Sequence, residues 1–138
     1  MNPDLVEEAF YTILHGDATL LALVPGGIWA TRPPAGTPLP YLRYNLDPSP
    51  VERYTLGGLV ITPLDYTFSA VTQGYTKEPA RTILARVRTL LQDATLTTDS
   101  GKVIYCRRSG FTAGDMSEER DGVLYQMCRA SYHIEALP

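Results

Sequence analysis

The sequence has few cysteines and histidines and no long apolar run. It contains two cysteines, Cys106 and Cys128, and two histidines, with no Cys-x-x-Cys pair. A zinc site is therefore not expected. Each cysteine lies in a predicted strand, where the two could face each other, but free buried thiols are the common case in a reducing cytosol. The longest apolar run, residues 20–24, is too short to span a bilayer.

An excess of positive charge is also lacking. The formal net charge is −3, and the pI is near 5.3, which argues against a general nucleic-acid-binding protein. Local groups of arginines at residues 81–88 and 107–108 are interpreted as solvated faces. The N-terminus has neither the basic start nor the apolar run of a signal peptide, so we expect synthesis and use in the cytoplasm. The length of 138 residues fits one domain.

Catalytic motifs are missing as well. The glycine pairs at residues 26–27 and 57–58 are not followed by the Lys-Ser/Thr of a phosphate loop, and neither Ser49 nor Ser109 lies in a nucleophile elbow. Four acidic residues in one segment could hold a divalent cation: Asp115, Glu118, Glu119 and Asp121. Their spacing does not match a calcium loop, so a flexible acidic loop is the simpler interpretation. We predict no enzyme activity, no cofactor and no metal site.

Two helices are indicated at the start of the chain. Asn2 can cap the first, Pro3 suits its first turn, and His15 with the following glycine ends it. Its apolar residues recur at helical spacing: Leu5, Val6, Ala9, Phe10, Ile13 and Leu14. Asp17 can cap a short second helix that residues 25–27 terminate. Together these helices predict an arm with one apolar face.

A longer helix is predicted further along, with Thr76 as its cap. Its apolar stripe should cover a sheet: Ala80, Ile83, Leu84, Val87, Leu90 and Leu91.

Strand patterns occupy much of the rest of the chain, at residues 28–31, 41–46, 59–73, 102–108 and 123–136. Residues 32–40 are rich in proline and predict a stiff, extended connector between the first two strands. Pro63 suggests that the third strand begins at an edge or a bulge. Loops are predicted at residues 47–58, 94–101 and 109–122.

The order of these elements predicts an α+β fold: a mostly antiparallel sheet, an N-terminal helical arm and one long helix packed on one face. We expect a single domain over residues 1–138, with the arm at 1–25 and the sheet plus helix at 26–138. Alternation along the strands supports this assignment, because a sheet with one covered face needs apolar residues on that face only.

The opposite sheet face is the unusual feature. Alternation assigns to it Tyr41, Arg43, Asn45, Asp65, Thr67, Ser69, Tyr125, Met127, Arg129 and His133. Tyrosine, methionine and arginine are enriched in protein interfaces. A monomer would tolerate such a face too, but we favour an assembly surface. The predicted loop that carries Glu118, Glu119 and Arg120 could dock on an oppositely charged partner, in a contact that salt would weaken.

The proline-rich segment also carries a family resemblance. Gly27-Ile28-Trp29 opens a strand, and Ala35-Gly36-Thr37-Pro38-Leu39-Pro40-Tyr41 leads into the next. A strand-plus-helix unit follows at residues 66–91, and Gly122-Val123-Leu124-Tyr125 introduces the last strand. In this order, after an amphipathic helix, these elements resemble the tail-completion (tail-terminator) proteins of long-tailed bacteriophages over residues 5–137. The loops at 47–58 and 109–121 depart from the family pattern.

The resemblance implies a structural virion protein without catalysis. Similar proteins form a hexameric ring on the head-proximal end of the tail tube, stop tube polymerisation and join the tail to the head connector. The implied partners are further copies of the chain, the tail tube protein and the connector or stopper protein. No membrane is implied. Sequence-specific nucleic-acid binding is not expected, although the channel of such a ring would let DNA pass. The implied location is the virion tail or neck, after assembly in the host cytoplasm.

Two alternatives remain open from the sequence. One is a head-completion or stopper protein of the same neck, which differs in ring position within the particle. The other belongs to a different class and is a small ligand- or metal-binding domain built around the acidic segment.

Overall fold

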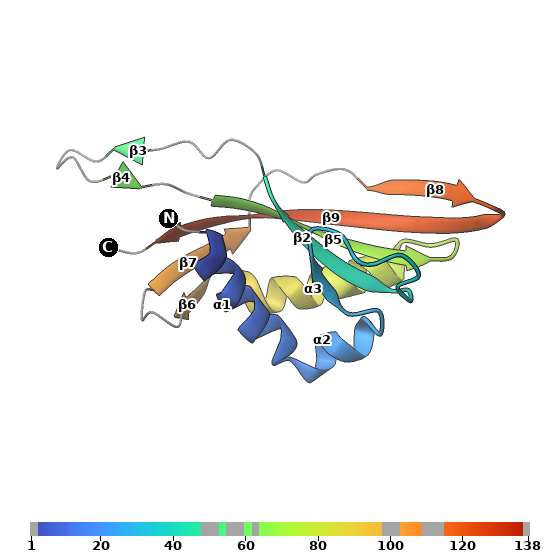
Figure 1. Cartoon of the computed structure of the whole chain (residues 1–138), viewed down its shortest axis with the longest axis horizontal. Coiled ribbons are helices and arrows are strands. Elements are labelled where there is room, and N and C mark those ends of the chain that lie inside the picture. The colour runs from blue at the N-terminus through green and yellow to red at the C-terminus, as the bar shows by residue number, and fades with distance from the viewer. Residues whose placement is uncertain are drawn as a thin grey trace.

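The fold is seen in a computed structural model that describes residues 3–47, 53–54, 60–61, 64–97, 103–108 and 115–136. Within these residues, three helices lie on one side of a mostly antiparallel sheet (Figure 1). The helices are α1 (Pro3–His15), α2 (Ala18–Leu23) and α3 (Glu78–Leu91). The predicted α+β architecture, with a helical N-terminal segment and one long helix on the sheet, is therefore confirmed.

Nine strands accompany the helices in the described part of the chain. They are β1 (Ile28–Ala30), β2 (Tyr41–Leu46), β3 (Arg53–Tyr54), β4 (Val60–Ile61), β5 (Leu64–Gln73), β6 (Ala94–Thr97), β7 (Val103–Arg108), β8 (Met116–Arg120) and β9 (Val123–Ala136). Seven of these form one sheet in the order β1-β2-β5-β9-β7-β6, with β8 paired to β9, while β3 and β4 pair with each other. All pairs are antiparallel except β1 with β2.

The proline-rich connector joins the parallel strands β1 and β2 and folds back on the chain. The amide of Gly26 donates to the carbonyl of Pro40 at 3.0 Å, and the amide of Leu42 donates to Gly27 at 3.1 Å. A Cβ atom on Gly26 would lie 1.9 Å from the carbonyl oxygen of Pro38. Only glycine therefore lets the connector approach this closely, which fixes where β2 begins.

The hydrophobic core lies between the helices and one face of the sheet, which we call the inner face. Phe10 of α1 is fully buried, and its ring meets three others edge-on, at centroid distances of 5.7 Å to Tyr44, 5.1 Å to Tyr66 and 5.4 Å to Phe68. Such edge-to-face pairs stabilise the fold beyond what the burial of the rings alone contributes. The α3 side chains that face the sheet are also buried: Ala80, Ile83, Val87 and Leu91. The predicted apolar stripes of both helices are thus confirmed where they are described.

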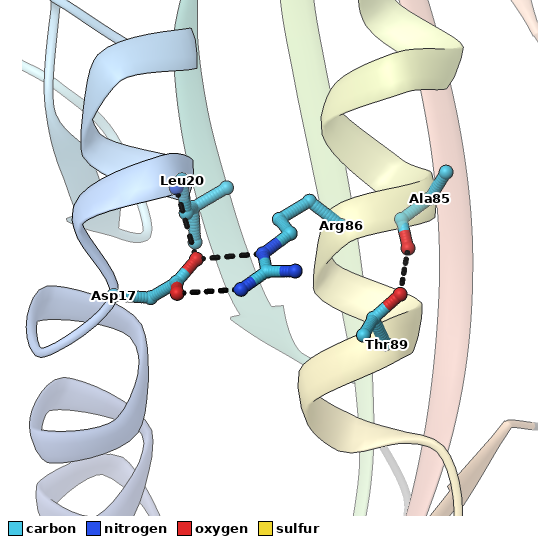
Figure 2. Close-up of polar contacts among 5 residues, drawn as sticks. All are labelled: Asp17, Leu20, Ala85, Arg86 and Thr89. Atoms are coloured by element: carbon cyan, nitrogen blue, oxygen red, sulfur yellow. Dashed lines mark hydrogen bonds and ion pairs between the residues drawn. The ribbon is translucent and has the colours of Figure 1, made fainter.

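An ion pair joins the short helix α2 to α3. Asp17 accepts hydrogen bonds from Nε and Nη2 of Arg86, at 2.8 and 2.7 Å, and from the amide of Leu20 at 2.9 Å (Figure 2). The predicted cap of α2 is therefore confirmed, and the same carboxylate also reaches across to α3. The Arg86 guanidinium lowers the pKa of Asp17, with help from the Leu20 amide. Because a two-point contact fixes both side chains, it sets how α2 lies beside α3.

Several boundaries differ from the sequence-based expectations. The predicted loop at residues 94–101 contains strand β6, and the predicted loop at 47–58 contains β3, which pairs with β4. The segment 109–122 contains strand β8. Each of these strands is short or exposed, so its sequence does not need the apolar alternation that marks a half-buried strand.

The start of α3 also differs from expectation. Thr76 is not its cap: the N-cap position is Lys77, which makes no side-chain capping bond, and a proline occupies the first turn. Proline has no amide hydrogen and its φ suits a helix start, so it defines this end without a side-chain cap. The suggested roles of Asn2 and Pro63 lie outside the described residues.

Removing the Phe10 ring should destabilise the protein strongly. We expect Phe10→Ala to lower the free energy of unfolding by about 3–5 kcal/mol, because the cavity lies among three other rings. Urea denaturation followed by circular dichroism measures the change. Tyr11→Ala, which removes a side chain that is 61% exposed on the next position of α1, is the control and should cost much less. Equal losses would contradict the assigned core.

The Asp17–Arg86 pair should make stability depend on pH. Because the folded-state pKa of Asp17 is lowered, its contribution is present above the ordinary pKa of 3.8 and is lost as the pH falls through the folded-state value. Asp17→Asn keeps a cap oxygen but removes the charge. Its thermal midpoint should therefore lie below that of the wild type at pH 7 and converge with it in acid. Glu8→Gln, at an exposed position of α1, should show no such convergence.

Candidate assembly surface

The second face of the sheet, here called the outer face, has no described helix against it. The strand register brings eight of the predicted interface residues onto this one face: Tyr41, Arg43, Asp65, Thr67, Tyr125, Met127, Arg129 and His133. Apart from Asp65, which is exposed, all of them are half-buried. The alternation read from the sequence is therefore confirmed in β2, β5 and β9, and the face is continuous across these three strands.

Two cross-strand rows run through the middle of the outer face. The first joins Arg43, Ser69 and Arg129 of β2, β5 and β9. Ser69 is only 1% exposed, so the side chains around it cover it. The second row is largely apolar and extends over four strands: Tyr41, Val71, Met127 and Met116. Val71 and Met116 were not among the predicted interface residues, and they complete an apolar band beside the two arginines.

Polar pairs occupy one end of the outer face. Nδ1 of His133 lies 2.8 Å from Oδ1 of Asp65, directly across the β5–β9 pair. In the next row, Thr67 donates to Asp47 at 2.7 Å and lies 3.3 Å from the hydroxyl of Ser131. These contacts satisfy each side chain within the chain itself. This end of the face is therefore less available to a partner than the rows of Arg43 and Tyr41.

The acidic segment is a hairpin and not the flexible loop that the sequence suggested. Strand β8 pairs with the start of β9, and Asp121 and Gly122 form the two-residue turn with φ of 51° and 78°. Two positive φ values define a type I′ turn, which matches the twist of paired strands. The Asp-Gly dipeptide was the signal that could have predicted this hairpin.

The hairpin separates its charged residues onto two faces. Glu118 and Arg120 pair in register with Tyr125 and Val123 and so lie on the outer face, where Nε and Nη2 of Arg120 contact the Glu118 carboxylate at 2.9 and 3.0 Å. This contact raises the pKa of Arg120. Glu119 pairs with Leu124 and lies on the inner side. The three residues predicted to act together from one loop are thus divided by the register.

A depression of about 300 Å³ lies beside α3 and β9, and its rim holds an ion pair between Arg81 and Asp115 at 3.3 Å. Within the described ranges, no three histidine, cysteine or carboxylate side chains gather closely enough to hold a metal ion. Of the four acidic residues considered for such a site, Asp115 and Glu118 are engaged with arginines. None of the described helices is long and apolar enough to cross a membrane.

Comparison with known proteins identifies the family of this chain. The model for the tail completion protein gp17 family matches residues 8–135. The chain belongs to this family. It is accordingly a structural component of a phage tail and part of the virion. A search of curated proteins finds no match.

Solved structures support the fold. A chain from the virion of a native gene transfer agent particle is 20% identical, with a TM-score of 0.66, over 97% of this chain and 96% of that one. A second solved chain is 17% identical, with a TM-score of 0.58, over 100% of this chain and 99% of that one. This chain therefore shares its fold with both, and at these identities the likeness concerns the fold alone.

The two cysteines should be unreactive in the folded protein. Both are free and at most 1% exposed, and burial raises the pKa of Cys106 to about 12 and also raises that of Cys128. At pH 8 a thiol reagent such as Ellman's reagent should react very slowly with the native protein. After unfolding in urea, both thiols should react readily. Rapid labelling of the native protein would contradict the packing around β7 and β9.

Proposed function

We propose that this tail completion protein forms a hexameric ring on the head-proximal end of the tail tube, ends tube polymerisation and joins the tail to the head connector. Its partners are further copies of itself, the tube protein and the connector or stopper protein. The ring is assembled in the host cytoplasm, and its channel lets DNA pass without reading its sequence. The role is structural and involves no catalysis.

The observation that carries this proposal is the family match over residues 8–135. The outer face gives it a physical basis. A sheet face that combines Tyr41, Tyr125 and Met127 with arginines has the composition of an interface core. Contacts between unlike surfaces of identical copies close into a ring when their rotation allows it. Each stable contact of this kind should bury roughly 800 Å² per partner.

Tube assembly in vitro tests the function directly. Purified tail tube protein should polymerise into long tubes alone and into shorter tubes, each with a ring at one end, when the chain is added. Negative-stain images give the lengths, and light scattering gives the mass of the chain. A chain that stays monomeric at high concentration and leaves tube growth unchanged would contradict the proposal.

Two variants separate assembly from folding. Arg129→Glu, on the outer face, should weaken ring formation and leave the circular dichroism spectrum unchanged. Leu84→Asp places a charge on the side of α3 that packs against the core and should unfold the protein. Equal effects of the two variants on folding would contradict the assignment of the outer face as an assembly surface.

A further inference from the structure

Arg43 is a charged side chain of the outer face whose hydrogen-bonding groups are incompletely satisfied. It is half-buried, and its Nε is buried without a hydrogen-bond partner among the described residues. The contact that its guanidinium does make is a weak one, from Nη2 to the Sδ of Met127 at 3.9 Å. A partly desolvated guanidinium without an acceptor is costly, and a carboxylate is the group that satisfies it best.

Two other arginines of the same chain show the geometry that Arg43 lacks. Arg86 and Arg120 each present Nε and Nη2 side by side to one carboxylate, at 2.7–2.8 Å and 2.9–3.0 Å. At Arg43 the equivalent Nε is covered by the chain and unpaired, and the Nη2 meets a thioether. The half-buried Arg43 guanidinium is therefore paired with no carboxylate among the described residues.

The residues around Arg43 indicate which kind of side chain a carboxylate bound there should have beside it. The apolar row of Tyr41, Val71, Met127 and Met116 lies in the neighbouring register position, and Met116 is 47% exposed. A ligand that fits both rows presents an acidic residue next to an apolar one. Such a pair would bury the apolar row and give the guanidinium its partner.

The inner side of the β8–β9 hairpin offers this combination. Glu119 and Leu124 are direct cross-strand partners and so share one face. Glu119 is exposed, and Leu124 is only half-buried although it lies on the inner face of the sheet. The reason is visible in Figure 1, where the hairpin reaches past the end of α3, so that the helix layer does not cover this part of the strands.

We propose that Glu119 of one copy binds Arg43 of the next, with the inner side of the hairpin laid across the neighbour's outer face and Leu124 against its apolar row. The contact joins unlike surfaces and so repeats from copy to copy, as the contacts of a ring must. This inference rests on the proposed ring and assigns the subunit contact within it. Glu118 is already paired with Arg120 on the other side of the hairpin, which leaves Glu119 as the acidic group for the neighbour.

Charge reversal tests the pairing. Arg43→Glu and Glu119→Arg should each raise the dissociation constant for ring formation at least about tenfold, because like charges then meet in a partly buried contact. The measurement is sedimentation velocity, with and without purified tail tubes. An equimolar mixture of the two variants should assemble again. In a ring in which the two variants alternate, every second junction pairs the natural Glu119 of one copy with the natural Arg43 of the next. At the other junctions, the introduced arginine faces the introduced glutamate. Opposite charges therefore meet at every junction.

The matched control is Glu8→Arg, which reverses an exposed carboxylate on α1 and should leave ring formation unchanged. Circular dichroism should show that all variants fold. Rings that persist in both reversal variants, or variants that fail to recover when mixed, would overturn the pairing and leave the proposed function intact. Loss of tube attachment in Arg43→Glu, with its self-association unchanged, would overturn the pairing by assigning the carboxylate to the tube. A wild-type chain that forms no ring even on tubes would contradict the proposed function itself.

Discussion

The packing of Phe10 among Tyr44, Tyr66 and Phe68 is the constraint on which the arrangement of the molecule depends. These rings come from α1, β2 and β5, so one contact holds the N-terminal helix on the inner face of the sheet. Helix α3 packs on the same face against β5, β9 and β7, and Arg86 holds α2 beside it. The large buried side chains therefore lie on the inner face of the sheet and in the helices that cover it. The outer face keeps its tyrosines, methionine and arginines without a described layer to cover them.

Much of the inner face could be predicted because its physical signal is local. In β5, Leu64, Tyr66 and Phe68 alternate with polar residues, and only a strand covered on one side needs that period. The pairing of β5 with β9, and the parallel pairing of β1 with β2, could not be predicted in the same way. Those contacts join residues that are distant in sequence, and the pattern within each strand is compatible with several orders.

The candidate site was predictable in composition but not in detail. Alternation identified the outer-face positions, whereas the segment of β8 was expected to be a loop because both faces of an exposed hairpin tolerate polar residues. The side on which Glu119 lies depends on the register that the Asp121-Gly122 turn sets between β8 and β9. A slip of that register by one residue would move every side chain of β8 to the opposite face. The unpaired Nε of Arg43 depends on burial by neighbouring strands, which no single strand pattern contains.

A core confined to one side has a consequence for how such a protein can diverge. Substitutions on the outer face remove little of the apolar area that the core buries, so they should be accepted at small cost to folding. The same architecture is retained in solved chains that share only 20% and 17% of their residues with this one. The sheet thus keeps one packed face constant, and the residues of its other face can be exchanged as a set without rebuilding the core.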